Sequence, residues 1–236
     1  MASESVVAVM QLLARFRFVP SDVIREECFS GYKTESQVRI ANRTLKQLRD
    51  RGLVDSEIVF GRTWVHWLTE EGARANDVEG GRGVGPKLAE YEHDLSIIKL
   101  WQVLREDPRV ERIVTEREAR SEGPDPSENE WAIPITRQSG TKGYAWPDLI
   151  TIGSNGRWGH EVEWTRKNKQ RLRLLMLAYG RDARYSGGIY YSTRANHAVI
   201  TECAEIVNER LAEGGYGRQI ITWELADKLE EKGEAR

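Results

Sequence analysis

The stretch TLKQLRDRGLVDSEIVFGRTWVHWLTEEG, residues 44–72, decides how the first part of the chain folds. Its opening residues place apolar side chains at helical spacing and stop at Gly52, which suits the left-handed position after a helix end. Two β-rich runs follow, Val54–Phe60 and Thr63–Leu68, around the two-residue turn Gly61-Arg62. The stretch therefore predicts a helix followed by a two-stranded hairpin.

Three helices are predicted ahead of that hairpin, because apolar residues recur at three- and four-residue spacing. The first helix buries one stripe, formed by Val6, Val9, Met10, Leu13 and Phe16. Pro20-Ser21-Asp22 suits the start of a second helix, which runs through Phe29. Thr34 is expected to cap a third helix through Arg51, whose buried face is formed by Val38, Ala41, Leu45 and Leu48.

Three helices closed by a hairpin are the element order of a winged helix-turn-helix. The phrases TLKQLRDRGLV and WLTEEG resemble those of many bacterial winged-helix DNA-binding domains, across residues 1–76. The resemblance implies that the third helix enters the major groove of double-stranded DNA, which is about as wide as a helix with its side chains. It also implies that the hairpin tip reaches the adjacent minor groove.

The third helix carries the residues expected to contact DNA. Residues 33–51 hold six Lys or Arg against two acids, although the whole chain has a formal charge of −2. Gln37 could pair with adenine and Arg39 or Arg43 with guanine, whereas Lys46 and Arg49 suit phosphates. The expected DNA contacts of this domain are Lys33, Ser36, Gln37, Arg39, Arg43, Lys46, Arg49 and, at the hairpin tip, Arg62.

A glycine-rich linker at residues 77–86 is predicted to separate this domain from a second one at residues 87–236. Helices are expected at 87–105, 166–181 and 196–212, and strands at 110–116, 131–136, 146–153, 158–164, 188–192 and 219–223. This alternation indicates a mixed sheet flanked by helices. The expected fold class is a two-domain α+β or α/β protein.

Three carboxylates are predicted to meet in the second domain. Asp148 begins one strand, and Glu161 and Glu163 lie two apart on the next, where side chains share a face. A turn between the strands would bring Asp148 to that face, where oxygen ligands could hold Mg²⁺. A metal so held can polarise a phosphodiester and activate a water.

Pro147-Asp148 and Glu161-Val162-Glu163 resemble the PD-(D/E)xK nuclease motif, with Glu163 in place of its Lys. Some restriction enzymes of that fold use Glu there, and Lys167 or Lys169 could act from a shifted position. The resemblance implies a catalytic set of Asp148, Glu161, Glu163 and Lys167, with Asp148 and Glu161 as metal ligands. If the motif has decayed, the domain only binds DNA and needs no Mg²⁺.

Both halves together resemble the replication-relaxation family of bacterial mobile elements, a winged helix followed by a degenerate nuclease-like domain. The residues that carry the resemblance are His93-Asp94-Leu95, Pro147-Asp148, Glu161, Glu163 and the basic helix ending at Tyr179. It implies a role in replication, mobilisation or their control. Residues 157–184 carry eight basic against three acidic residues, and Arg166, Lys169 and Arg173 are expected to add DNA contacts.

The leading hypothesis is a sequence-specific double-stranded DNA-binding protein that acts as a regulator or accessory factor of a mobile element, through replication, mobilisation or transcription control. The alternative is a Mg²⁺-dependent endonuclease or nickase, and a protein-binding adaptor would leave the basic segments unexplained. No apolar run approaches the ~20 residues of a membrane helix, and the two cysteines lack metal or disulfide spacing, so we expect a cytoplasmic protein that has no membrane partner. Winged-helix binders often pair on two-fold DNA sites, which leaves a homodimer open.

Overall fold

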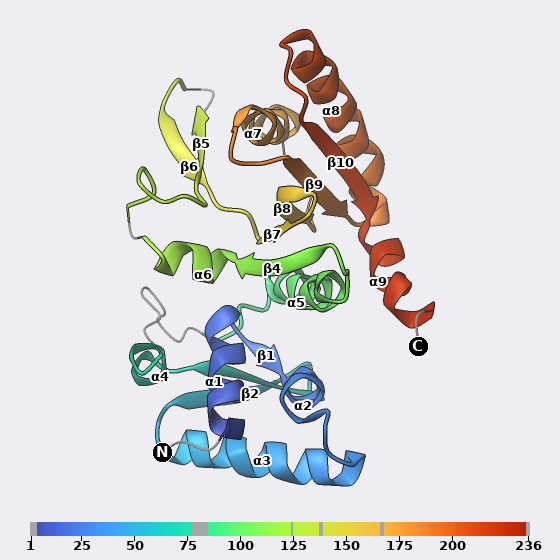
Figure 1. Cartoon of the computed structure of the whole chain (residues 1–236). Coiled ribbons are helices and arrows are strands. Elements are labelled where there is room, and N and C mark those ends of the chain that lie inside the picture. The colour runs from blue at the N-terminus through green and yellow to red at the C-terminus, as the bar shows by residue number, and fades with distance from the viewer. Residues whose placement is uncertain (1–3, 77–84, 124, 137–138, 166–167, 235–236) are drawn as a thin grey trace. The chain divides into compact units, whose positions relative to one another are not determined.

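The chain folds as a mixed α+β protein in two compact units, Met1–Leu95 and Ser96–Arg236 (Figure 1). The computed structural model describes residues 4–76, 85–123, 125–136, 139–165 and 168–234. Among the described residues, no helix is both long and apolar enough to cross a bilayer.

The first unit combines helices with a three-stranded antiparallel sheet in the order β1-β3-β2. Its elements are α1 (Glu4–Arg15), β1 (Val19–Pro20), α2 (Ser21–Phe29), α3 (Thr34–Asp50), β2 (Val54–Val59), β3 (Thr63–Leu68) and α4 (Glu70–Arg74). The expected order of helices and hairpin is confirmed, and the sequence reasoning missed the short strand β1. That strand pairs Val19 with His66 and thereby ties the α1–α2 connection to the hairpin.

The apolar stripe predicted for α1 is confirmed, since each of its residues is buried. In α3, Ala41, Leu45 and Leu48 are buried as expected, but Val38 is 40% exposed and Thr44 takes its place in the core. The predicted cap is wrong: Lys33 is the N-cap residue, and no side chain caps the helix. Gly52 has the expected left-handed backbone, with φ of 70°.

Residues 87–95, which we expected to begin the second domain, belong to the first unit instead. The ring of Tyr91 stacks on Phe18 with centroids 5.1 Å apart, and Arg17 pairs with Glu90 and Asp94. An aromatic stack and two ion pairs therefore hold this segment to the first unit. Within the predicted linker, residues 77–84 lie outside the described part of the chain.

The second unit is built on a five-stranded mixed sheet in the order β10-β9-β8-β7-β4. Its elements are α5 (Tyr91–Arg105, which starts in the first unit), β4 (Val110–Thr115), α6 (Glu116–Ser121), β5 (Ile133–Thr136), β6 (Lys142–Ala145), β7 (Leu149–Gly153), β8 (Gly156–Glu163), α7 (Lys169–Arg181), β9 (Gly187–Ser192), α8 (Arg194–Glu213), β10 (Gln219–Glu224) and α9 (Leu225–Glu234). Strands β4, β7 and β8 are antiparallel, whereas β8, β9 and β10 are parallel. The expected mixed sheet is confirmed; α6, β6 and α9 were not predicted.

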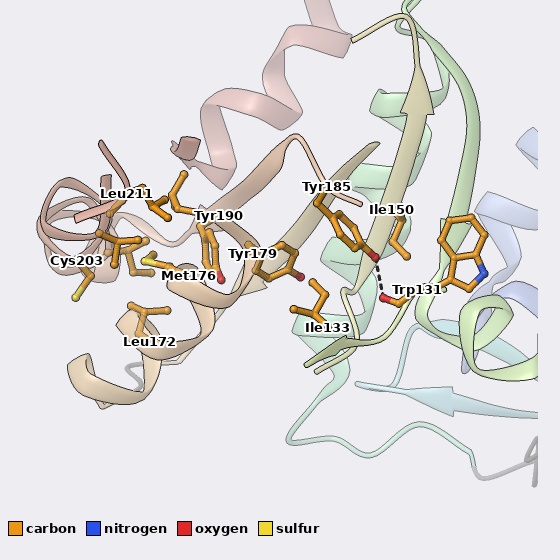
Figure 2. Packing of buried hydrophobic residues seen from close by; sticks show 14 of the residues in the cluster. Trp131, Ile133, Ile150, Leu172, Met176, Tyr179, Tyr185, Tyr190, Cys203 and Leu211 are labelled. Atoms are coloured by element: carbon orange, nitrogen blue, oxygen red, sulfur yellow. Dashed lines mark hydrogen bonds between the residues drawn. The ribbon is translucent and has the colours of Figure 1, made fainter. Parts of the chain in front are cut away.

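The core of the second unit lies where α7 and α8 pack against each other and the sheet, and α7 also contacts β5 (Figure 2). Met176 and Tyr179 of α7 are fully buried there, beside Tyr190 of β9. The ring of Tyr179 lies directly over Gly159 of β8, where an added Cβ would come within 2.1 Å of a ring carbon. Glycine at this position is therefore what lets the tyrosine lie against the sheet.

Candidate nucleic-acid interface and carboxylate cluster

The basic side chains of α3 lie on its solvent-facing side. Burial of Ala41, Leu45 and Leu48 turns one face of the helix toward the core, and the opposite face remains open. Of the predicted contacts, Lys33, Arg39, Arg43, Lys46 and Arg49 are exposed, and Ser36 and Gln37 are half-buried. The structure thus brings the basic residues of α3 together on one accessible surface, whereas Gln37, four residues before the buried Ala41, lies on the side of the helix that faces the core.

A hollow of about 630 Å³ separates α2, α3 and the hairpin of the first unit. Its wall includes Arg25 of α2, Lys46 and Arg49 of α3, and Arg62 at the start of the hairpin's second arm. Asp22 is the one acidic side chain among the residues that line it. Lys46 Nζ lies 2.7 Å from Oδ2 of Asp50, so the positive charge of the hollow comes mainly from Arg25, Arg49 and Arg62.

Sequence reasoning placed Lys46, Arg49 and Arg62 at this surface but missed other residues of the hollow. Arg25 of α2 and Asn42 of α3 line the hollow but are not among the residues that the sequence predicted as DNA contacts. Trp64 was not predicted either, because the alternating pattern assigns it to a strand but does not show which face of that strand other elements cover. A basic residue one turn into α2 was the signal that could have found Arg25.

The hairpin tip differs from the expected turn. Phe60, which we predicted as the last residue of the strand, has a φ of 50° and is followed by Gly61 with a φ of 67°. The Arg62 N–H donates to the Val59 carbonyl at 3.2 Å, so Phe60 and Gly61 are the central residues. Left-handed φ at both central positions matches the twist of a hairpin. Arg62 remains exposed beside the tip.

His66 forms part of the wall of the hollow and is held neutral. Its Nε2 lies 2.8 Å from the Ser21 hydroxyl, and only 2% of the residue is exposed. Burial lowers the pKa of His66 to about 4, and the positive charge of Arg49 acts in the same direction. The imidazole therefore adds no charge to this surface near neutral pH.

The second candidate site is the group of three predicted carboxylates. Strands β7 and β8 pair with Leu149 opposite His160, which brings Asp148 beside the end of β8. The Val162 N–H donates to Oδ2 of Asp148 at 2.7 Å. Glu161 and Glu163 are only 6% and 1% exposed, so both are buried at the same end of the sheet.

Two buried tyrosines, Tyr179 and Tyr190, interact with these carboxylates. Burial raises the pKa of Tyr190 well above its ordinary value, and the charges of Glu161, Glu163 and Asp148 raise it further. The Tyr179 hydroxyl donates to Oε1 of Glu161 at 2.5 Å. Of the three carboxylates, Glu161 is thus the one that a tyrosine of α7 holds by a direct hydrogen bond.

The described carboxylates do not fit Mg²⁺ as a set of three ligands. Within the part of the chain that the structure describes, no three His, Cys, Asp or Glu side chains are grouped so as to hold a metal ion. Asp148 already accepts from a backbone N–H and Glu161 from a phenol. The predicted catalytic Lys167 and the predicted DNA contact Arg166 lie outside the described residues.

The predicted DNA contacts on α7 are matched by an acid from α8. Lys169 Nζ lies 2.6 Å from Oε2 of Glu202, and an Arg173 guanidinium nitrogen lies 3.4 Å from Oε1. A phosphate would have to displace Glu202 to use either of these cations. Glu202 thus partly neutralises the positive charge that the sequence predicts for α7.

Removing one hydroxyl from each of the two tyrosines is expected to have opposite effects. Tyr179→Phe should lower the free energy of unfolding by about 1.5–3 kcal/mol, because a hydrogen bond to a charged group is lost. Tyr190→Phe should raise it by about 1 kcal/mol, because among the described residues the buried Tyr190 hydroxyl has no hydrogen-bond partner. Urea unfolding followed by circular dichroism measures both variants; a shift in the same direction would contradict this account.

No protein-family model, curated protein or solved structure matches the chain.

Proposed function

We propose that the first unit is a winged helix that binds double-stranded DNA, and that the chain acts as a sequence-specific regulator or accessory factor of a mobile element. The observation that carries the proposal is the exposed basic face of α3 beside a hairpin that presents Arg62. A helix with a long exposed basic face has the dimensions to enter a major groove.

The architecture of the first unit supports this proposal. Helix α3 precedes a hairpin whose second arm, β3, also pairs with β1 and is therefore the central strand of the three-stranded sheet. The basic hollow between α2, α3 and the hairpin suits a sugar–phosphate strand that borders a groove. Helix and hairpin can then occupy the grooves on either side of that strand.

The residues divide into two roles. Arg39 lies in the amino-terminal half of α3 and Arg43 just past its middle, on the exposed side of the helix, and we assign both to base edges. Lys46, Arg49 and the hairpin's Arg62 surround the hollow and suit phosphates and the minor groove, contacts that set position. Sequence preference is therefore assigned to the first group and overall affinity to both.

The second unit is proposed to be a nuclease-like domain that supports binding and does not cleave DNA. The order of β7, β8 and α7, with Asp148 ahead of β7 and Glu161 and Glu163 at the end of β8, is compatible with the PD-(D/E)xK resemblance. The hydrogen bonds already made by the carboxylates favour a structural role. The mobile-element assignment rests on the resemblance of both halves to the replication-relaxation family.

Selection of duplexes from random sequence tests the DNA-binding proposal. The wild-type protein is expected to enrich one sequence pattern over successive rounds, because paired hydrogen bonds from Arg discriminate between base pairs. Binding of the selected duplex is then measured by gel shift against a scrambled duplex. Failure to enrich any pattern, together with equal affinity for both duplexes, would contradict sequence-specific binding.

Incubating supercoiled plasmid with the protein and Mg²⁺ or Mn²⁺ distinguishes the DNA-binding proposal from the nuclease alternative. Our proposal expects no nicked product from the wild-type protein. Nicking that disappears in Asp148→Ala would instead establish the enzyme, with DNA binding by the first unit as its targeting step.

A further inference from the structure

The hollow of the first unit is larger and more aromatic than contact with a phosphate strand requires. Its volume of about 630 Å³ falls within the range of about 300–1,000 Å³ typical of pockets that hold small ligands. Trp64 lines it together with Arg49 and Arg62. The hollow therefore offers an indole face as well as positive charge.

Trp64 leaves a large apolar area uncovered on this surface. The residue is 48% exposed, and Ile58, its direct partner across the hairpin, is 50% exposed. The same face of the hairpin is buried farther along, where His66 contacts Ser21 of α2. The exposed pair thus forms an apolar shelf at the edge of a cationic hollow, and contiguous apolar area at such a place marks a binding surface.

The wall of the hollow also contains an unmatched polar atom. Nδ1 of His66 is buried and has no hydrogen-bond partner among the described residues, while Nε2 is occupied by Ser21. A buried polar atom without a partner is costly, so it needs an explanation in terms of a ligand or water. The atom is itself covered, however, so the groups that can contact a ligand in the hollow are Arg49, Arg62 and Trp64.

We propose that this hollow receives an unpaired nucleotide of the bound DNA, with its base stacked on Trp64 and its phosphate held by Arg49 and Arg62. A base inside a duplex has both faces covered by its neighbours and cannot offer one to an indole. An unpaired base that leaves the stack can do so, and stacking on an aromatic side chain is favourable for every base. The inference rests on the proposed function and names the form of DNA that the surface prefers.

The test compares the selected duplex with versions carrying one extra unpaired thymine, moved stepwise along the site. At one position the wild-type protein is expected to bind the bulged duplex about tenfold tighter than the paired one, measured by fluorescence anisotropy with labelled DNA. Trp64→Phe keeps an aromatic face and should retain most of the preference. Trp64→Leu keeps apolar bulk without that face and should lose it. Trp223→Leu changes another exposed tryptophan, in the second unit, and serves as the control.

Each outcome is decisive. Equal binding of paired and bulged duplexes by the wild-type protein at every position overturns the inference and leaves the proposed function standing. A preference that persists unchanged in Trp64→Leu also overturns it, since another surface would then hold the base. If the wild-type protein binds none of these DNAs, the proposed function itself fails.

Discussion

Replacing Arg39 and Arg43 together by alanine is expected to weaken binding of the selected duplex by about 100-fold or more. Each bidentate contact between an arginine and a guanine contributes about 1–3 kcal/mol of discrimination, and each 1.4 kcal/mol is about tenfold in affinity. Both residues are exposed on α3, and alanine favours a helix, so the fold should be retained. Gel shift with selected and scrambled duplexes gives the two affinities.

The control variant also removes two arginines, but from α8 of the second unit. Arg194 and Arg210 are exposed on α8, far in sequence from the proposed interface. Arg194→Ala with Arg210→Ala is expected to change affinity for the selected duplex by less than about threefold, through long-range electrostatics alone. If the α3 double variant binds the selected duplex as well as this control does, α3 is not the reading helix.

Acidification from pH 7.0 to 4.5 is expected to destabilise the protein through two buried histidines, one in each unit. Burial lowers the pKa of His66 to about 4, with a contribution from Arg49, and that of His160 to about 3, with a contribution from Lys228. In the unfolded chain both titrate near 6.5. The unfolded state therefore takes up protons first as the pH falls, and the free energy of unfolding decreases below about pH 6.5.

The expected loss is about 2 kcal/mol for each histidine between pH 7.0 and 4.5, levelling off only below the folded-state pKa values. Urea unfolding followed by circular dichroism at the two pH values measures it. His66→Gln and His160→Gln should each shrink the difference between the two pH values, even where they lower stability at both. The range stops at pH 4.5 because most carboxyl groups titrate below it. A difference unchanged in both variants would show that other groups cause the acid sensitivity.

The sequence was sufficient to predict helices and strands whose pattern depends only on residues close together in the chain. The spacing of Ala41, Leu45 and Leu48 predicted both a helix and its buried face, because a helix repeats every 3.6 residues whatever lies around it. The missed helix α6 also had a local signal: Thr115 and Glu118 form a capping box. We assigned Glu116 to the preceding strand and so passed over that signal.

For the candidate sites, the sequence predicted which residues take part but not which side chains contact them. Alternation along β8 correctly placed Glu161 and Glu163 on one side of the sheet, but not the phenol that binds Glu161, because Tyr179 comes from a helix. The partner that neutralises Lys169 lies 33 residues away, on α8. Such pairings depend on how helices pack on the sheet, and no local pattern encodes them.

The contact between Tyr179 and Gly159 links helix position to the state of the carboxylates. Because Gly159 of β8 has no side chain, the ring of Tyr179 can lie against the strand and its hydroxyl can reach Glu161. Bulk introduced at residue 159 would lift the helix without altering any ionisable group. It would nevertheless remove the hydrogen bond from Tyr179 to the buried Glu161, so adding a methyl group to this strand would change the electrostatic environment of that carboxylate.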